Sequence, residues 1–407
     1  MHYARRRAAL FTLLGVAAAC GRGHTQADRA GCDPSLKLPE GFCATIVADT
    51  VGKARQIAVR GNGDIFVARL SSRRDSGGVS VIRKDSVVRF GTTATHGLLL
   101  ASDSSLYVST AHEVLHYRFA GLAMEPGKRV DTVVAGLPGG SVPDHALALD
   151  PHGFLLVTVS AVSSDCHRRT PCPDLATSGG IWRFDTGKRN QTLAQGTRIA
   201  TGLGNPTALA VNVADTMVYA ITRGPDSLHE RIPQFDAFDA ATHPVDELIR
   251  VVSVRADYGW PYCYYDLKAR ARVQSPDYGG DGHVVGACDR FILPLTIFPA
   301  HWEPIALLFP QRGKLPSNYR SGAFVAFHGS SHRAPLPEAG YIVAFVPFKN
   351  GAPSIDFETF ADGFAGQIQS PTGALHRPSG LAEGPDGSIY VSDDKAGRIW
   401  RIAVKAK

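Results

Sequence analysis

The sequence predicts an all-β fold, namely a six-bladed β-propeller. Its 42 Gly and 26 Pro residues favour many turns over long helices. One theme recurs along the chain: a short apolar strand, a turn rich in Gly, Asp, Asn or Ser, and a second strand with aromatic or β-branched residues. Polarity alternates within these units, which is typical of antiparallel strands.

The repeated theme occurs six times, and we expect each copy to supply the first two strands of one blade. Further strand-like segments, such as residues 79–90 and 180–185, follow most copies, so each unit has enough strands for a four-stranded blade. A pair of β-sandwiches is the alternative fold, and six copies of one theme make it the less favoured. The six copies are residues 55–69, 96–110, 145–159, 205–222, 303–329 and 378–393.

The two ends of the repeat array predict how the ring closes. The last copy is followed by a single strand-like segment, residues 398–404, and is one strand short. The strand-like residues 42–49 precede the first copy and have no unit of their own. We expect residues 42–49 to complete the sixth blade, since closure removes exposed sheet edges. A long insertion, about residues 225–300, precedes the inner strand of the fifth blade.

The N-terminus has the pattern of an export signal. Residues 5–7 are three arginines, and residues 8–19 form an apolar run that is too short to span a bilayer. Small residues directly before Cys20 are typical of a bacterial lipoprotein cleavage site, and a plain signal peptide is the alternative. We therefore expect a signal peptide (1–19), a lipidated Cys20 with a polar tether (20–31) and the propeller (32–407). The protein would be exported to the periplasm and attached to the membrane only through its lipid anchor.

Six cysteines remain after Cys20, an even number that suits disulfides in an oxidising compartment. Six cysteines allow 15 pairings, and proximity in the sequence favours neighbours along the chain. Metal binding is the weaker interpretation, because the spacings are not those of a zinc site. The favoured pairs are Cys32–Cys43, Cys166–Cys172 and Cys263–Cys288.

The charge of the chain excludes one class of function. Lys and Arg number 43 against 37 Asp and Glu, which gives a formal charge of +6 at pH 7. No run of Lys or Arg and no basic helix accompanies this excess, so we expect no nucleic-acid partner.

Propeller topology predicts where the functional side chains meet. The loop entering the first strand of each blade and the loop leaving the second strand open on the same face. These loops carry many His and Arg residues, among them His96, His145, His301 and Arg377. Arg carries a permanent positive charge and forms bidentate hydrogen bonds to carboxylates, so this face suits an anionic ligand. A solvated polar rim is the alternative.

Several motifs in these loops and strands resemble one known family. They are LKLPEGFCATIVAD, DELIRV, ADYGWPYCYYD, FVAFHGSSHRAP and RPSGLAEGPDGSIYVSDDKAGRIWRI, in this order between residues 36 and 403. The chain resembles the pyrroloquinoline quinone (PQQ)-dependent soluble sugar dehydrogenases, in particular the L-sorbosone/aldose dehydrogenase branch. The resemblance implies a six-bladed propeller that binds PQQ and Ca²⁺ and oxidises a sugar hydroxyl or aldehyde by hydride transfer to the quinone.

The resemblance also implies site residues, which we transfer one by one. Asn205, Arg333 and Arg377 match cofactor-binding positions, and Gly224 with Pro225 matches a pair that binds calcium through its backbone.

Two family positions are changed. The family's catalytic histidine falls at Val142, and a cofactor-pairing arginine falls at Gly204. We expect His145 to act as the substitute base, with His96 and His301 on the substrate rim.

Three functions therefore stay open at this point. The first is an active sugar dehydrogenase, which would need a separate electron acceptor because the sequence has no Cys-x-x-Cys-His haem motif. The second is a catalytically degenerate propeller that binds a sugar or an anionic cell-envelope ligand. The third is a calcium-dependent hydrolase, which is disfavoured because the loops carry His and Arg rather than Asp, Glu and Asn.

The aromatic residues of YGWPYCYY either line a sugar site or pack the insertion onto the ring.

Overall fold

The structure is a computed structural model that describes residues 31–139, 145–161, 166, 170–224 and 236–405. Residues from Cys32 onward form one folded unit. The expected signal peptide, Cys20 with its tether, Val142 and Pro225 lie outside the described residues.

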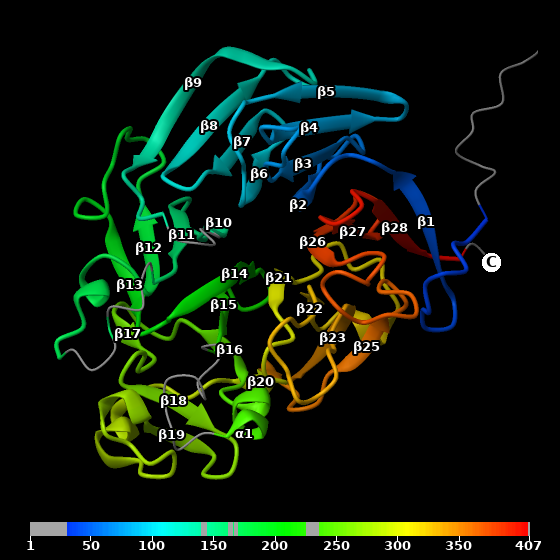
Figure 1. Ribbon diagram of the computed structural model, residues 1–407. Helices are drawn as coiled ribbons and strands as arrows, with labels where there is room; N and C mark the ends of the chain where they lie inside the picture. The colour runs from blue at the N-terminus through cyan, green and yellow to red at the C-terminus, as the bar shows by residue number, and fades with distance from the viewer. Residues whose placement is uncertain (1–30, 140–144, 162–165, 167–169, 225–235, 406–407) are drawn as a thin grey trace, which may run out of the picture. The chain divides into compact units, whose positions relative to one another are not determined.

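Six small antiparallel sheets form the blades, as the sequence predicts (Figure 1). The first blade contains β2 (Ala54–Val59), β3 (Ile65–Arg69), β4 (Gly78–Arg83) and β5 (Ser86–Phe90). The second contains β6 (Leu98–Ser102), β7 (Ser105–Ser109), β8 (Glu113–Phe119) and β9 (Pro126–Ala135). The third contains β10 (Leu147–Leu149), β11 (Leu155–Val159), β12 (Gly180–Phe184) and β13 (Thr197–Thr201).

The other three blades follow the same plan. The fourth contains β14 (Asn205–Asn212), β15 (Met217–Arg223), β16 (Asp246–Arg250) and β20 (Thr296–Phe298). The fifth contains β21 (Pro304–Leu308), β22 (Gly322–Phe327), β23 (Ile342–Lys349), β24 (Ala352–Pro353) and β25 (Glu358–Ala361). The sixth contains β26 (Pro378–Glu383), β27 (Ile389–Asp393), β28 (Ile399–Val404) and β1 (Phe42–Ala48).

The ring closes through β1, as the sequence predicts. β1 pairs antiparallel with β28, from Phe42 opposite Val404 to Ala48 opposite Ile399. The first strand of each blade contacts the first strands of its two neighbours, in the cycle β2, β6, β10, β14, β21, β26 and back to β2. These six strands therefore surround the axis of the propeller.

The long segment between β15 and β21 is only partly an insertion. Two of its strands, β16 and β20, are the outer strands of the fourth blade. The short strand β17 (Ala256–Asp257) adds to the third blade by parallel pairing with β13. What remains is α1 (Ala237–Thr242) and a separate hairpin of β18 (Cys263–Asp266) and β19 (Ala271–Gln274), which lie outside the ring (Figure 1). Single 3-10 turns are Pro173–Ala176, Pro276–Tyr278, Gly286–Arg290 and Ser317–Tyr319.

Face-to-face packing of the blades forms the core. Strands β3, β11 and β22 are buried along their whole length, because each blade is covered on both faces by its neighbours. Aromatic rings fill the space between the fifth and sixth blades, where Phe324 and Phe360 pack edge to face with ring centroids 4.8 Å apart. Burial of one such side chain contributes about 1.5–3 kcal/mol.

The three expected disulfides are confirmed. Their Cα–Cα distances are 5.2, 4.8 and 5.9 Å, all within the usual range for a disulfide. The disulfide pairs are Cys32–Cys43, Cys166–Cys172 and Cys263–Cys288.

In the described part of the chain, no helix has the length and apolar character needed to cross a membrane.

Candidate functional site

The candidate site is the end of the propeller at which the first strand of each blade begins and the second strand ends, which we call the mouth. His96 precedes β6, His145 precedes β10, and Asn205 begins β14. A small cavity at the axis collects residues from the starts of five first strands, so the expected convergence of these loops occurs. Its lining residues are Arg55, Gln56, His96, Gly97, His145, Ala146, Thr207 and Ile305.

A charged network spans the fifth and sixth blades at the mouth. The imidazole of His328, which follows β22, lies between two carboxylates. Its Nδ1 is 3.3 Å from Glu303 Oε2, and its Nε2 is 2.8 Å from Asp394 Oδ1. Arg55 extends the network into the first blade, with Nη1 3.2 Å from Asp394 Oδ2. All four side chains are largely buried.

Two further guanidinium groups approach Glu303. Arg377 Nη2 lies 3.4 Å from Glu303 Oε2, and Arg223 Nη2 lies 3.7 Å from Glu303 Oε1. Arg377 is held in place because its Nε donates to the carbonyl oxygen of His328 at 2.9 Å. The mouth therefore brings three arginines around two carboxylates.

The arginines and His328 change the acidity of both carboxyl groups. Burial raises the pKa of Glu303, but the hydrogen bond from His328 and the charges of Arg223 and Arg377 outweigh it and lower the pKa to about 2. Burial likewise raises the pKa of Asp394, and His328 and Arg55 outweigh it and lower the pKa to about 2. Both groups are therefore carboxylates at neutral pH, and the network keeps its charge.

His145 lies at the axis, but carbonyl oxygens face both of its ring nitrogens. Nδ1 is 2.8 Å from Thr158 O and Nε2 is 3.3 Å from Ala111 O, with the side chain almost fully buried. A neutral imidazole has only one N–H donor, so a base at this position would need one nitrogen turned away from these carbonyls. These contacts favour a structural role for His145 over that of a proton acceptor.

His301 is buried and does not lie on the substrate rim, where we expected it. It is 2% exposed, and its Nε2 is 2.7 Å from the carbonyl oxygen of Ala240 in α1. The reason is α1, a helix not predicted from the sequence, which covers His301.

Asn205 begins β14, where Ser160 Oγ donates to its Oδ1 at 3.1 Å. The preceding Gly204, at the position of the family's arginine, faces the indole of Trp260. A Cβ added at Gly204 would lie 2.7 Å from Cδ1 and Nε1 of that ring, so no larger side chain fits without movement. Trp260 therefore takes the space that a side chain at position 204 would need.

The expected calcium position is described only at its first residue. The backbone N–H of Gly224 donates to Asp246 Oδ1 at 3.0 Å, which fixes the end of β15. A Cβ at Gly224 would lie 2.5 Å from the carbonyl oxygen of Pro244, so only glycine fits here. Among the residues described, no group of three or more His, Cys, Asp or Glu side chains is placed to hold a metal ion.

Arg333 lies in the loop after β22. Its Nη1 donates to the carbonyl oxygen of Pro337 in the same loop at 2.8 Å, and burial lowers the pKa of its guanidinium group. Glu303, in contrast, is central to the network and was missed by the sequence analysis. The available signal was its place in the loop that enters the inner strand of the fifth blade, since the entering loops of other blades carry His96, His145 and Arg377.

The fold is a six-bladed β-propeller, and its mouth carries a buried network of arginines, carboxylates and one histidine. The chain belongs to the TrAA12-like family, whose family model matches residues 36–405. The resemblance drawn from the sequence motifs is thereby confirmed.

Solved structures share this fold over most of their length. The iodide structure of family AA12 from Trichoderma reesei has a TM-score of 0.75 at 19% identity and covers 91% of this chain and 98% of its own. The calcium structure of the same family has a TM-score of 0.74 at 18% identity and covers 94% of this chain and 99% of its own. The holo form of the pyranose dehydrogenase PQQ domain from Coprinopsis cinerea has a TM-score of 0.72 at 16% identity, covering 90% of this chain and 96% of its own. The PQQ-bound aldose sugar dehydrogenase from Streptomyces coelicolor has a TM-score of 0.56 at 16% identity, covering 91% of this chain and 100% of its own.

One curated relative is similar over a shorter stretch. An uncharacterized protein of Borreliella burgdorferi is 24% identical over 205 residues. The match covers 50% of this chain and 48% of that protein, so it spans about half the length of each.

Proposed function

We propose that this chain is an exported PQQ- and calcium-dependent dehydrogenase that oxidises a hydroxyl or aldehyde group of a small sugar. One observation carries the proposal: Arg55, Arg223 and Arg377 gather at the mouth of a TrAA12-like propeller. Similar propellers include PQQ-bound and calcium forms, which supports the same cofactors here.

The residues at the mouth fit a cofactor of this kind. PQQ carries three carboxylates, and the network has three guanidinium groups against the two carboxylates of Glu303 and Asp394. Arg223, Arg377 and Asn205 would bind the cofactor, with Arg333 at its edge, and the carbonyl groups of Gly224 and Pro225 would bind Ca²⁺. When bound, PQQ supplies the two-electron acceptor for the hydride that leaves the sugar carbon, and Ca²⁺ supplies a Lewis acid.

The chain itself must take the proton from the sugar hydroxyl. We assign this proton to His96 rather than His145, because the His96 side chain is partly exposed at the mouth whereas the His145 side chain is almost fully buried. Electrons would leave to a separate acceptor protein or dye, since the sequence has no attachment motif for a c-type haem.

A second candidate is a propeller that binds a sugar or an anionic ligand without turnover. Two observations favour it: valine occupies the family's histidine position at 142, and the nearby His145 is engaged with carbonyl oxygens. Loss of a general base costs about 10²- to 10⁴-fold in rate, so an active enzyme needs its substitute.

Titration of the purified protein with PQQ and Ca²⁺ separates the two candidates. Cofactor absorbance reports binding, and sugar-dependent dye reduction reports turnover. We expect saturable PQQ binding at micromolar concentration together with aldose-dependent dye reduction. Absence of PQQ binding overturns the proposal, and binding without turnover selects the second candidate.

Substitution of the two histidines then tests the base. His96→Ala is expected to lower the turnover rate by about 10²- to 10⁴-fold while PQQ still binds. Unchanged turnover in His96→Ala, with loss of turnover in a folded His145→Ala protein, would return the role to His145.

The location of the protein is part of the same proposal. The three disulfides suit an oxidising compartment, and the N-terminal pattern suits lipid attachment at Cys20. Cys20→Ser is expected to move the protein from the membrane fraction to the soluble periplasmic fraction. An unchanged membrane fraction would exclude the lipid anchor.

A further inference from the structure

A second pocket lies away from the mouth, where the β18–β19 hairpin meets the Cys166–Cys172 disulfide. Its volume is about 460 Å³, which is enough for a sugar unit or two. We call it the insertion pocket and define it by six of its lining residues: Tyr262, Gln274, Asp277, Tyr278, Arg290 and Phe291.

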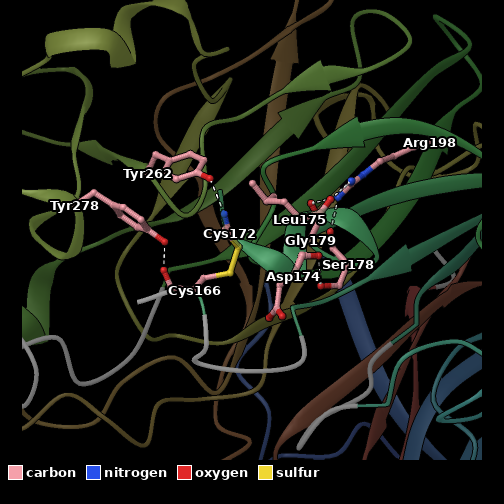
Figure 2. Close-up of a disulfide and its surroundings, with 9 residues drawn as sticks. All are labelled: Cys166, Cys172, Asp174, Leu175, Ser178, Gly179, Arg198, Tyr262 and Tyr278. Atoms are coloured by element: carbon pink, nitrogen blue, oxygen red, sulfur yellow. Dashed lines mark hydrogen bonds between the residues drawn. A yellow bond between two sulfur atoms is a disulfide. The ribbon is translucent and has the colours of Figure 1, made fainter. Parts of the chain in front are cut away.

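Two tyrosines of the insertion form an aromatic wall of fixed orientation. The rings of Tyr262 and Tyr278 meet edge to face, with centroids 4.8 Å apart and an interplanar angle of 67°. Figure 2 shows the Tyr262 hydroxyl directed at Cys172 and the Tyr278 hydroxyl directed at Cys166. The backbone N–H of Cys172 donates to the Tyr262 hydroxyl at 2.9 Å, and the Tyr278 hydroxyl donates to the carbonyl oxygen of Cys166. The polar ends of both rings are thus satisfied, and the rings themselves remain as pocket surface.

Two disulfides hold the walls of the insertion pocket. Cys166–Cys172 joins the two residues that the tyrosine hydroxyls contact, and Cys263–Cys288 packs with the buried Phe291 as a small apolar cluster. Such cross-links reduce the ordering cost of binding, because they remove conformational freedom before a ligand binds.

Polar groups complete the lining. Gln274 and Asp277 offer an amide and a carboxylate, and the exposed Arg290 places its guanidinium 4.8 Å from the ring centroid of Phe291. Gln274 is itself oriented, since its Nε2 donates to the carbonyl oxygen of Tyr278 at 2.5 Å. A saccharide presents apolar C–H faces for aromatic rings and hydroxyl groups for charged and amide partners, which is the combination found here.

A short turn of the chain separates the insertion pocket from a narrow cleft that borders the mouth. Residues 259–263 place Tyr262 in this pocket and Trp260 in the cleft, whose lining also includes Arg223 and Gly224. Cys263, at the end of the turn, lines both.

We propose that the insertion pocket is a subsite for an oligosaccharide whose terminal unit reaches the mouth. The proposal rests on the proposed function for the fate of that terminal unit, and it names the substrate class as an oligomer rather than a free monosaccharide. Within it, Tyr262 and Tyr278 stack against a sugar ring, and Arg290 binds hydroxyl groups.

Calorimetry on the cofactor-free protein tests the subsite independently of any redox reaction. The probes are glucose, maltohexaose and cellohexaose. We expect one of the hexaoses to bind more tightly than glucose, and Arg290→Ala to weaken that binding by about tenfold, as for the loss of one hydrogen bond to a charged group. Arg312→Ala, an exposed arginine on another part of the chain, is the matched control and should leave binding unchanged.

Kinetics of the PQQ-loaded protein give a second readout. Arg290→Ala should raise KM for the hexaose while kcat, and both constants for glucose, stay unchanged. Equal binding of glucose and both hexaoses, or a hexaose affinity that Arg290→Ala does not alter, overturns the subsite. Failure of the proposed function is distinguishable, since it abolishes dye reduction with every sugar and leaves calorimetric binding intact.

Discussion

The Nε2 atom of His328 lies 2.8 Å from Asp394 Oδ1, and this contact joins two blades at the mouth. His328 follows β22 of the fifth blade, and Asp394 follows β27 of the sixth. On the other side of the same ring, Nδ1 lies 3.3 Å from Glu303, which precedes β21. One imidazole therefore links the loops that also position Arg55 and Arg377.

Removal of this imidazole should destabilise the propeller. His328→Gln removes one hydrogen-bond partner from each of the buried carboxylates of Glu303 and Asp394, and a hydrogen bond to a charged group contributes about 1.5–3 kcal/mol. Urea denaturation should show a fall of this size in the free energy of unfolding at neutral pH. His332→Gln, four residues later and exposed, is the matched control. Equal stability of the two variants would contradict the role assigned to His328.

Acid should weaken the same network. The pKa values of Glu303 and Asp394 are lowered to about 2, below their values in an unfolded chain. Their contribution to stability is complete above the unfolded pKa values, near 4, and is lost as the pH falls through about 2. Each contribution is on the order of a few kcal/mol.

Urea denaturation over this acidic range measures the effect. The free energy of unfolding should decrease steadily from about pH 5 to about pH 2. Glu303→Gln should have a shallower dependence, because one of the two titrating groups is gone. A wild-type protein whose stability is flat over this range would contradict the lowered pKa values.

The fold was predictable because its signals are local. Alternating polarity and turn residues mark each pair of first and second strands, and they also mark residues 42–49, which form β1. The strand β16 was harder to assign, since Asp246 and Glu247 are polar and yet buried. Their burial depends on the N–H of Gly224 and on Arg272, which are distant in the sequence. No local pattern contains that information.

The site was predictable at the level of composition and not of contacts. Propeller topology places His96, His145 and Arg377 at one end of the ring, and the structure does so. Whether a histidine faces a ligand or a carbonyl oxygen depends on its neighbours, which for His301 include Ala240 of α1. Sequence alone does not reveal which carboxylate the arginines surround, so Glu303 was missed.

The contact between Gly204 and Trp260 predicts an effect of a single methyl group. Gly204 does not have a positive φ, so the backbone tolerates alanine and only the indole opposes it. Gly204→Ala should destabilise the protein by about 1–3 kcal/mol through overpacking and should change the tryptophan fluorescence. Addition of Trp260→Ala in the same chain should relieve the overpacking. The control is Gly127→Ala, where the nearest heavy atom to the added Cβ is 3.5 Å away; an equal loss there would refute the contact.

Arg272 and Glu247 form a buried ion pair that attaches the β18–β19 hairpin to the fourth blade. Nη1 and Nη2 of Arg272 lie 3.1 and 2.7 Å from the two carboxylate oxygens, and its Nε donates to the carbonyl oxygen of Ile292 at 2.6 Å. Since both side chains are buried, Arg272→Met should leave an unpaired carboxylate and cost about 3–5 kcal/mol.

The double variant Arg272→Met with Glu247→Gln separates the pair from its surroundings. Without a buried charge, the double variant should regain much of the stability that Arg272→Met loses, because apolar or neutral replacements of both partners are often tolerated. The measurement is a double-mutant cycle of unfolding free energies in urea. Additive losses would mean that the two side chains stabilise the protein independently, and the hairpin would then be held by the Cys263–Cys288 disulfide and its packing alone.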